Sequence, residues 1–147
     1  MPHWKGGTMK DIFYLINSPL FLDKTIDEES LPPLGQGYIA TSLKNSGIDV
    51  SLIDCVKEKI TALEIINRIN SDHPKYVGIN IFTQYYEIVK SIIESITVQC
   101  IMFIGGQATK FLYQDIINWR TNNECFVIIG EGEYIIPSIC TKTCQQK

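Results

Sequence analysis

Glycine and amide residues follow several short apolar runs, and these residue types could hold a ligand. Gly105-Gly106 and Gly130-Glu131-Gly132 follow two of the runs, and Asn17 ends another. Glycine has no side chain and accepts positive φ, so it lets a ligand approach the backbone closely. Free N–H groups at the start of a following helix favour anionic or carbonyl-rich ligands. The pattern predicts a ligand-binding edge, although plain tight turns would use the same glycines.

Several other kinds of site find no support. A dinucleotide-binding motif would place G-x-G-x-x-G directly after the first strand, but Gly35-Gln36-Gly37 lacks the third glycine and lies far from it. No P-loop motif is present. A receiver domain of a two-component system would need a phosphoacceptor aspartate after the third strand, where Phe82-Thr83 stands. A Ser-His-Asp set is not credible, because the only histidines are His3 and His73, and His73 is expected on the surface away from this edge.

The elements that must position these residues alternate regularly. Apolar runs predict strands, and amphipathic spacing predicts helices. The expected strands are 11–17, 49–54, 75–82, 100–104 and 125–129, and the expected helices are 34–45, 60–69, 85–96, 111–119 and 133–140. This alternation implies parallel strands with right-handed crossovers. We therefore expect an α/β, flavodoxin-like (Rossmann-like) three-layer sandwich with a five-stranded sheet in the order 2-1-3-4-5, whose ligands bind beyond the carboxyl ends of the strands.

Helical spacing also predicts which side chains are buried. In the helix 34–45 the face comprises Leu34, Tyr38, Ile39, Ser42 and Leu43, and in the helix 60–69 it comprises Leu63, Ile66 and Ile69. Phe111 is expected to pack in the core. Glu131 and Glu133 are interpreted first as negative charges at a helix N-terminus.

Composition limits the class of protein. The chain has 147 residues, 45% of them hydrophobic, and a net charge of −3, which argues against nucleic-acid binding. No apolar run approaches the length of a membrane span. Five cysteines and no signal-peptide pattern favour free thiols and a cytoplasmic location. Residues 1–10 are interpreted as a flexible leader or an expression remnant, and residues 11–147 as one domain.

Five segments, in order, resemble the N-terminal cobalamin (B12)-binding domain of cobalamin-dependent radical SAM enzymes. They are LPPLGQGYIA (31–40), VSLID (50–54), VGINIFT (77–83), IGGQAT (104–109) and VIIGEGE (127–133). The resemblance covers nearly the whole chain. It implies that the nucleotide tail of cobalamin enters beside the first and third strands and that the corrin lies over the strand ends.

The resemblance also has departures. Classical B12 modules carry D-x-H-x-x-G, and the matching positions here are Ser30, Pro32 and Gly35. Pro32 offers cobalt no lone pair, so the resemblance implies base-off cobalamin without a histidine ligand. Asn80-Ile81-Phe82 takes the place of the S-x-L motif, and Gly105-Gly106 the place of the glycine pair that leaves room for the tail.

The expected cofactor-binding residues all lie at this edge. They are Asn17, Pro19, Leu34, Gly35, Asn80, Phe82, Thr83, Gln84, Tyr85, Gly105, Gly106, Gln107, Gly130, Glu131 and Gly132. No catalytic or metal-ligating residue is assigned.

The chain does not resemble a complete enzyme. Cys140 and Cys144 have the first spacing of a radical SAM cluster motif, but Lys147 stands where the third cysteine would be. A [4Fe–4S] cluster and S-adenosylmethionine are thus expected only with a radical SAM domain, in cis or in trans. Two alternatives stay open: a flavodoxin-like binder of another nucleotide or small ligand, and an interaction module with a degenerate cobalamin site.

Overall fold

The computed structural model describes residues 9–25 and 32–145, which form one parallel sheet with helices on both faces. The strands are β1 (Lys10–Asn17), β2 (Val50–Asp54), β3 (Pro74–Asn80), β4 (Ile101–Gly105) and β5 (Glu124–Val127). The helices are α1 (Leu34–Asn45), α2 (Ala62–Asp72), α3 (Tyr86–Ser95), α4 (Thr109–Ile116) and α5 (Gly132–Gln145), with a short 3-10 turn η1 (Thr83–Tyr85) before α3. All strand pairs are parallel in the order β2-β1-β3-β4-β5, so the predicted topology is confirmed.

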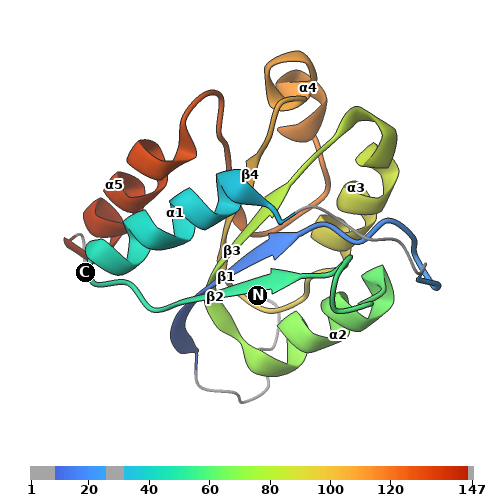
Figure 1. Cartoon of the computed structure of the whole chain (residues 1–147), viewed down its shortest axis with the longest axis horizontal. Coiled ribbons are helices and arrows are strands. Elements are labelled where there is room, and N and C mark those ends of the chain that lie inside the picture. Colours follow the sequence, from blue (N-terminus) through green and yellow to red (C-terminus); the bar gives the residue numbers. More distant parts are fainter. Residues whose placement is uncertain (1–8, 26–31, 146–147) are drawn as a thin grey trace.

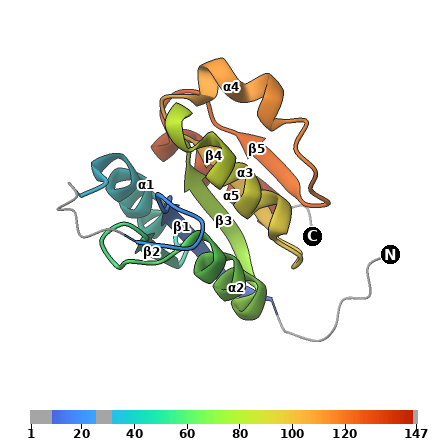
Figure 2. The same ribbon diagram turned by 90° about the vertical axis from the view of Figure 1, so that its right-hand side faces the viewer.

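The helices form two layers around the sheet (Figures 1 and 2). Helices α1 and α5 cover one face, where Leu43 and Ile136 pack on Phe13 and Phe103. Helices α2, α3 and α4 cover the other face, which holds the larger core with residues such as Ile69. Alternate side chains of each strand thus pack into two separate cores.

Strand ends differ from the predictions by one or two residues. The third strand ends at Asn80 rather than residue 82, because β4 ends at Gly105 and the N–H of Ile81 donates the last rung to the Gly105 carbonyl. The fifth strand ends at Val127, and Ile128 donates one further bond to Ile104. The segments that follow β3 and β5 leave the sheet at the same edge.

Two predicted helix faces are partly wrong. In α1 the buried residues are Gln36, Ala40 and Leu43, whereas Leu34 and Tyr38 are about 70% exposed (72% and 69%). The helix turns Gln36 toward the sheet, and this rotates the two large apolar residues outward. In α2 Ile66 and Ile69 are buried as predicted, but Leu63 is exposed because Ile65 takes the inner position.

Phe111 was also misplaced. Its side chain is 76% exposed on α4 rather than packed in the core, because Ile116 and the following Trp119 fill that part of the core instead. Among the described residues no helix is both long and apolar enough to cross a membrane. The predicted leader lies outside the described residues except for its last two positions, and β1 already begins at Lys10.

Candidate functional site: a slot between the sheet and two helices

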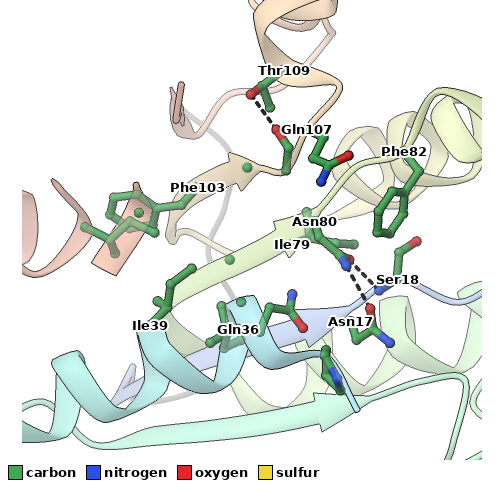
Figure 3. A pocket seen from close by; sticks show the side chains of 18 of the residues that line it. Asn17, Ser18, Gln36, Ile39, Ile79, Asn80, Phe82, Phe103, Gln107 and Thr109 are labelled. Carbon is green, nitrogen blue, oxygen red and sulfur yellow. Dashed lines mark hydrogen bonds between the residues drawn. The ribbon is translucent and has the colours of Figure 1, made fainter. Parts of the chain in front are cut away.

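A cavity of about 960 Å³ opens at the carboxyl edge of the sheet and runs inward between the strands and helices α1 and α5. We call this cavity the slot. Figure 3 shows side chains of β1, β3, β4 and α1 converging on it. Its volume lies at the upper end of the range for small-molecule and cofactor sites.

The inner part of the slot is apolar. Leu15 and Phe103 line its sheet side, and Ile39 and Ile136 line its helix side. Gly78 also contributes to the sheet side, where an added Cβ would lie 2.8 Å from Cε1 of Phe13. A side chain at Gly78 would therefore displace the Phe13 ring, which stacks on Phe103 with 5.5 Å between centroids.

The two helices that close the slot are held to one another. The hydroxyl of Ser42 donates a 2.6 Å hydrogen bond to the Glu133 carbonyl. An added Cβ on Gly132 would lie 3.1 Å from Cδ1 of Ile39, so the glycine permits the close approach of α5 to α1. The width of the slot is thus set by tight packing between these helices.

The two glycines at the end of β4, Gly105 and Gly106, have different roles. A Cβ on Gly105 would project on the slot side, with Cβ of Ile128 at 3.8 Å as its only neighbour within 4 Å. Gly106 has φ +120°, and a Cβ there would lie 2.8 Å from the Ile81 carbonyl oxygen. Gly105 therefore keeps the slot empty, while Gly106 makes the turn possible. That Gly106 also leaves room for a ligand stays a prediction, and the structure adds that its lack of a side chain avoids a clash with the Ile81 backbone.

Thr109 also stabilises the turn at Gly106. The Thr109 hydroxyl lies 2.8 Å from the carbonyl oxygens of both Gly106 and Ile128, and its side chain is buried. It links the loops after β4 and β5, and Figure 3 shows it above Gln107 at the slot's outer end. The two loops are thus joined through the Thr109 side chain.

Amide side chains join the ends of three strands. Asn80 donates from Nδ2 to Oδ1 of Asn17 at 2.7 Å, and Asn17 donates from Nδ2 to Oδ1 of Asp54 at 2.9 Å. Oδ1 of Asn80 accepts from the Ser18 backbone N–H at 2.8 Å (Figure 3). Each amide nitrogen carries two protons, so one N–H of Asn80 is not used in these bonds.

Gln36 places an amide in the helix wall of the slot. It is only 7% exposed, and its Nε2 donates a 2.6 Å hydrogen bond to the Ile16 carbonyl. Its Oε1 is buried and has no hydrogen-bond partner within the described part of the chain. Buried polar atoms are paired in the great majority of cases, so this acceptor is unusual.

The rim of the slot is aromatic and apolar. Phe82 is 42% exposed and meets Tyr85 edge-on, and Phe111 projects from α4 with the Lys110 ammonium 4.9 Å from its ring centroid. Leu34 adds a further exposed side chain at the start of α1. A broad flat ligand resting on this edge would contact apolar surface on several sides.

Most of the predicted site residues meet at the slot. The lining includes Asn17, Leu34, Gly35, Asn80, Phe82, Tyr85, Gly105, Gly106, Gln107, Gly130 and Gly132. Pro19, Thr83, Gln84 and Glu131 do not line it. Thr83 and Gln84 lie in η1, which turns them away while it directs Tyr85 toward the cavity.

Sequence reasoning missed the inner lining and Gln36. Period-two alternation from Asn17 back to Leu15, and from Gly105 back to Phe103, would have found the sheet side. The sequence carried no such signal for Gln36, because the predicted apolar face of the helix 34–45 did not include it.

Three described titratable side chains, those of Tyr85, Lys110 and Glu133, line the slot, whereas the described cysteines do not. Burial raises the pKa of Cys55 and of Cys100 to about 12, and of Cys125 to about 11. His73 caps the far end of α2 in the left-handed conformation, before β3 begins. No group of three His, Cys, Asp or Glu side chains able to hold a metal ion is found in residues 9–25 and 32–143.

One protein family matches most of the chain. The model of the B12 binding domain matches residues 27–139. The chain belongs to the B12 binding domain family. The match spans the slot-lining residues from Pro32 to Ile136 and leaves out those between Leu15 and Leu20.

Longer proteins contain similar domains. Hopanoid C-3 methylase of Methylococcus capsulatus is 26% identical over 132 residues, which are 87% of this chain and 25% of the methylase. Two solved structures of the radical S-adenosylmethionine methyltransferase TsrM from Kitasatospora setae have the same fold. The one with cobalamin and a [4Fe–4S] cluster bound gives a TM-score of 0.72 at 15% identity, covering 95% of this chain and 25% of TsrM. The one with tryptophan and aza-SAM bound gives 0.70 at 16% identity, covering 94% and 26%. The chain thus spans about a quarter of the length of these relatives.

The residues present fit a cobamide tail. Gly105 keeps a Cβ-sized space free on the slot side, Gln36 leaves a buried acceptor unpaired, and the inner walls are apolar. Together they form a narrow, mostly apolar cavity with a few polar groups, which suits an aromatic base linked to a sugar and phosphate.

Proposed function

We propose that this B12 binding domain holds cobalamin with its nucleotide tail in the slot and its corrin against the aromatic rim. The observation that carries the proposal is the open slot beside Gly105, bounded by α1 and α5. The cofactor supplies the organometallic chemistry, and the protein positions it.

We propose further that the bound cofactor is base-off and has no histidine ligand. Pro32 and Pro33 lie at the slot mouth, and prolines have no side-chain donor atom. The one described imidazole, that of His73, lies at the opposite end of β3. A tail inserted in the slot is withdrawn from cobalt, and no imidazole of the described chain is near to replace it.

The exposed apolar side chains of the rim support a second proposal, which concerns a partner domain. Leu34, Phe82 and Phe111 remain exposed around the mouth, and the related proteins are about four times longer. We propose that the domain presents its cofactor to a radical SAM domain, in cis or in trans, where the [4Fe–4S] cluster and S-adenosylmethionine would be bound. Free thiols at Cys55 and Cys100 support a reducing cytoplasmic compartment.

Titration of the purified chain tests the proposal. Hydroxocobalamin should remain bound after desalting, and its absorbance should change from that of the free cofactor. After reduction to cob(II)alamin, the electron paramagnetic resonance spectrum should lack the splitting that an axial nitrogen ligand produces. Flavin mononucleotide serves as the competing ligand: retained flavin with no retained cobalamin would favour the flavodoxin-like alternative, and retention of neither would favour a degenerate interaction module.

A further inference from the structure

The amide oxygen of Gln36, a residue of the slot lining, is a buried acceptor without a hydrogen-bond partner in the described part of the chain. Gln36 is held by its Nε2, which donates to the Ile16 carbonyl at 2.6 Å, and this bond fixes the plane of the amide. The other end of the amide, Oε1, is shielded from water and has no partner within the described part of the chain. Leaving such an acceptor unpaired is unfavourable, so a ligand donor that reached Oε1 would offset that cost.

The neighbouring side chains do not supply that donor. Asn17 and Asn80 are engaged with Asp54, Ser18 and one another at the strand ends. Figure 3 shows Gln36 reaching from α1 toward this edge, on the side of the slot opposite β3 and β4. Gln36 is not a member of the amide network, and its own bond is to the carbonyl of Ile16, the residue before Asn17.

We propose that Gln36 is a specificity-determining residue whose Oε1 accepts a hydrogen bond from an N–H or O–H group on the nucleotide tail of a cobamide. This inference rests on the proposed function. Two parts of a tail carry such donors. One is the ribose with its two free hydroxyl groups, present in every complete cobamide, and the other is a lower base with an amino group, such as adenine. Dimethylbenzimidazole, the base of cobalamin, has no N–H or O–H to donate once it is joined to ribose.

Three probes separate these sources: cobalamin, an adenine-containing cobamide, and cobinamide, which lacks the nucleotide. Their affinities are measured by absorbance titration with the wild-type chain and with Gln36→Met, which has similar volume and no acceptor oxygen. Thr41→Val is the matched control, because Thr41 lies on the exposed side of α1 and its hydroxyl bonds only the Gly37 carbonyl.

A ribose donor predicts that Gln36→Met weakens cobalamin and the adenine cobamide equally, by roughly tenfold, with cobinamide unchanged. A base donor predicts the same loss for the adenine cobamide alone, together with preferential binding of that cobamide by the wild type. Either result supports the proposal. Thr41→Val should bind all three probes as the wild type does.

The proposal is overturned if Gln36→Met binds both complete cobamides as tightly as the wild type, or if it loses cobinamide to the same degree, since that loss would reflect a general change in the domain. Because Gln36→Met also removes the bond to Ile16, its thermal unfolding is recorded beside the titrations. If the variant does not fold, the wild type decides: complete cobamides that bind no better than cobinamide exclude a donor on the tail. Failure of all three probes to bind the wild type would instead reject the proposed function itself.

Discussion

Asn80 donates a hydrogen bond to Asn17 across 2.7 Å, and this contact ties the end of β3 to the end of β1. The two strands are neighbours in the sheet although the residues are 63 positions apart in the chain. The contact lies where the order of the strands reverses, which is the usual place for a ligand in this class of fold. It therefore belongs both to the stability of the sheet edge and to the wall of the slot.

Replacing Asn80 should lower the stability of the domain. Asn80→Ala leaves Oδ1 of Asn17 and the Ser18 N–H without their partners, and we expect a loss of about 1–3 kcal/mol in the free energy of unfolding. Urea denaturation measures it. Asn118→Ala is the control, because the exposed Asn118 amide bonds only the Gln114 carbonyl and should change stability by less than about 0.5 kcal/mol. Equal stability of the two variants would mean that the amide network contributes nothing.

Enlarging Gly105 should close the slot without disturbing the fold. Gly105→Val places two methyl groups on the slot side, where only Ile128 is near, and cobalamin affinity should fall by roughly tenfold or more. Gly105→Ala should have an intermediate effect. Circular dichroism and thermal unfolding should stay near those of the wild type. Undiminished cobalamin binding by Gly105→Val would place the cofactor elsewhere on the molecule.

The adjacent glycine should respond in the opposite way. Gly106→Ala forces a side chain onto a residue with φ +120° and brings its Cβ within 2.8 Å of the Ile81 carbonyl. We expect a loss of about 1–3 kcal/mol in the free energy of unfolding, because the strained turn cannot relax without breaking the Ile81 rung. Gly105→Ala in the same denaturation series is the comparison, and it should be much the more stable. Similar values for both would contradict the separate roles assigned to the pair.

The buried thiols should resist alkylation until the domain opens. Burial raises the pKa of Cys55 to about 12, with Glu58 and Asp54 adding to the effect, and burial also raises the pKa of Cys100 to about 12. Because the folded pKa lies above the ordinary value of 9.0, the neutral thiols contribute their full stability below pH 9 and lose it as pH rises toward 12.

Iodoacetamide labelling at pH 8, read by peptide mass spectrometry, should therefore be slow at Cys55 and Cys100 in the native chain and fast in urea. The less buried Cys125, whose pKa is raised only to about 11, should label sooner than either and provides the internal comparison. Labelling of Cys55 at the rate of Cys125 would show that the region around Cys55 opens readily.

The order of the sheet and the edge that carries the slot followed from the sequence by itself. Apolar runs such as 11–17 and 100–104 alternate with amphipathic segments, and a parallel α/β chain of this length has few topologies open to it. The glycines after β4 and β5 and the amides Asn17 and Asn80 then had to gather at one edge, because the carboxyl ends of parallel strands meet there.

Only the tertiary structure decided how deep the slot is and which wall carries polar atoms. The periodicity of α1 favoured burial of Leu34 and Tyr38, but its packing against α5 turned Gln36 inward and those two residues outward. Likewise, the sequence alone does not distinguish the two adjacent glycines, yet Gly105 faces the slot and Gly106 faces the Ile81 backbone. Hydrophobic patterning constrains which face of an element is apolar on average, whereas the rotation of a helix and the φ of one turn residue depend on contacts between segments far apart in the chain.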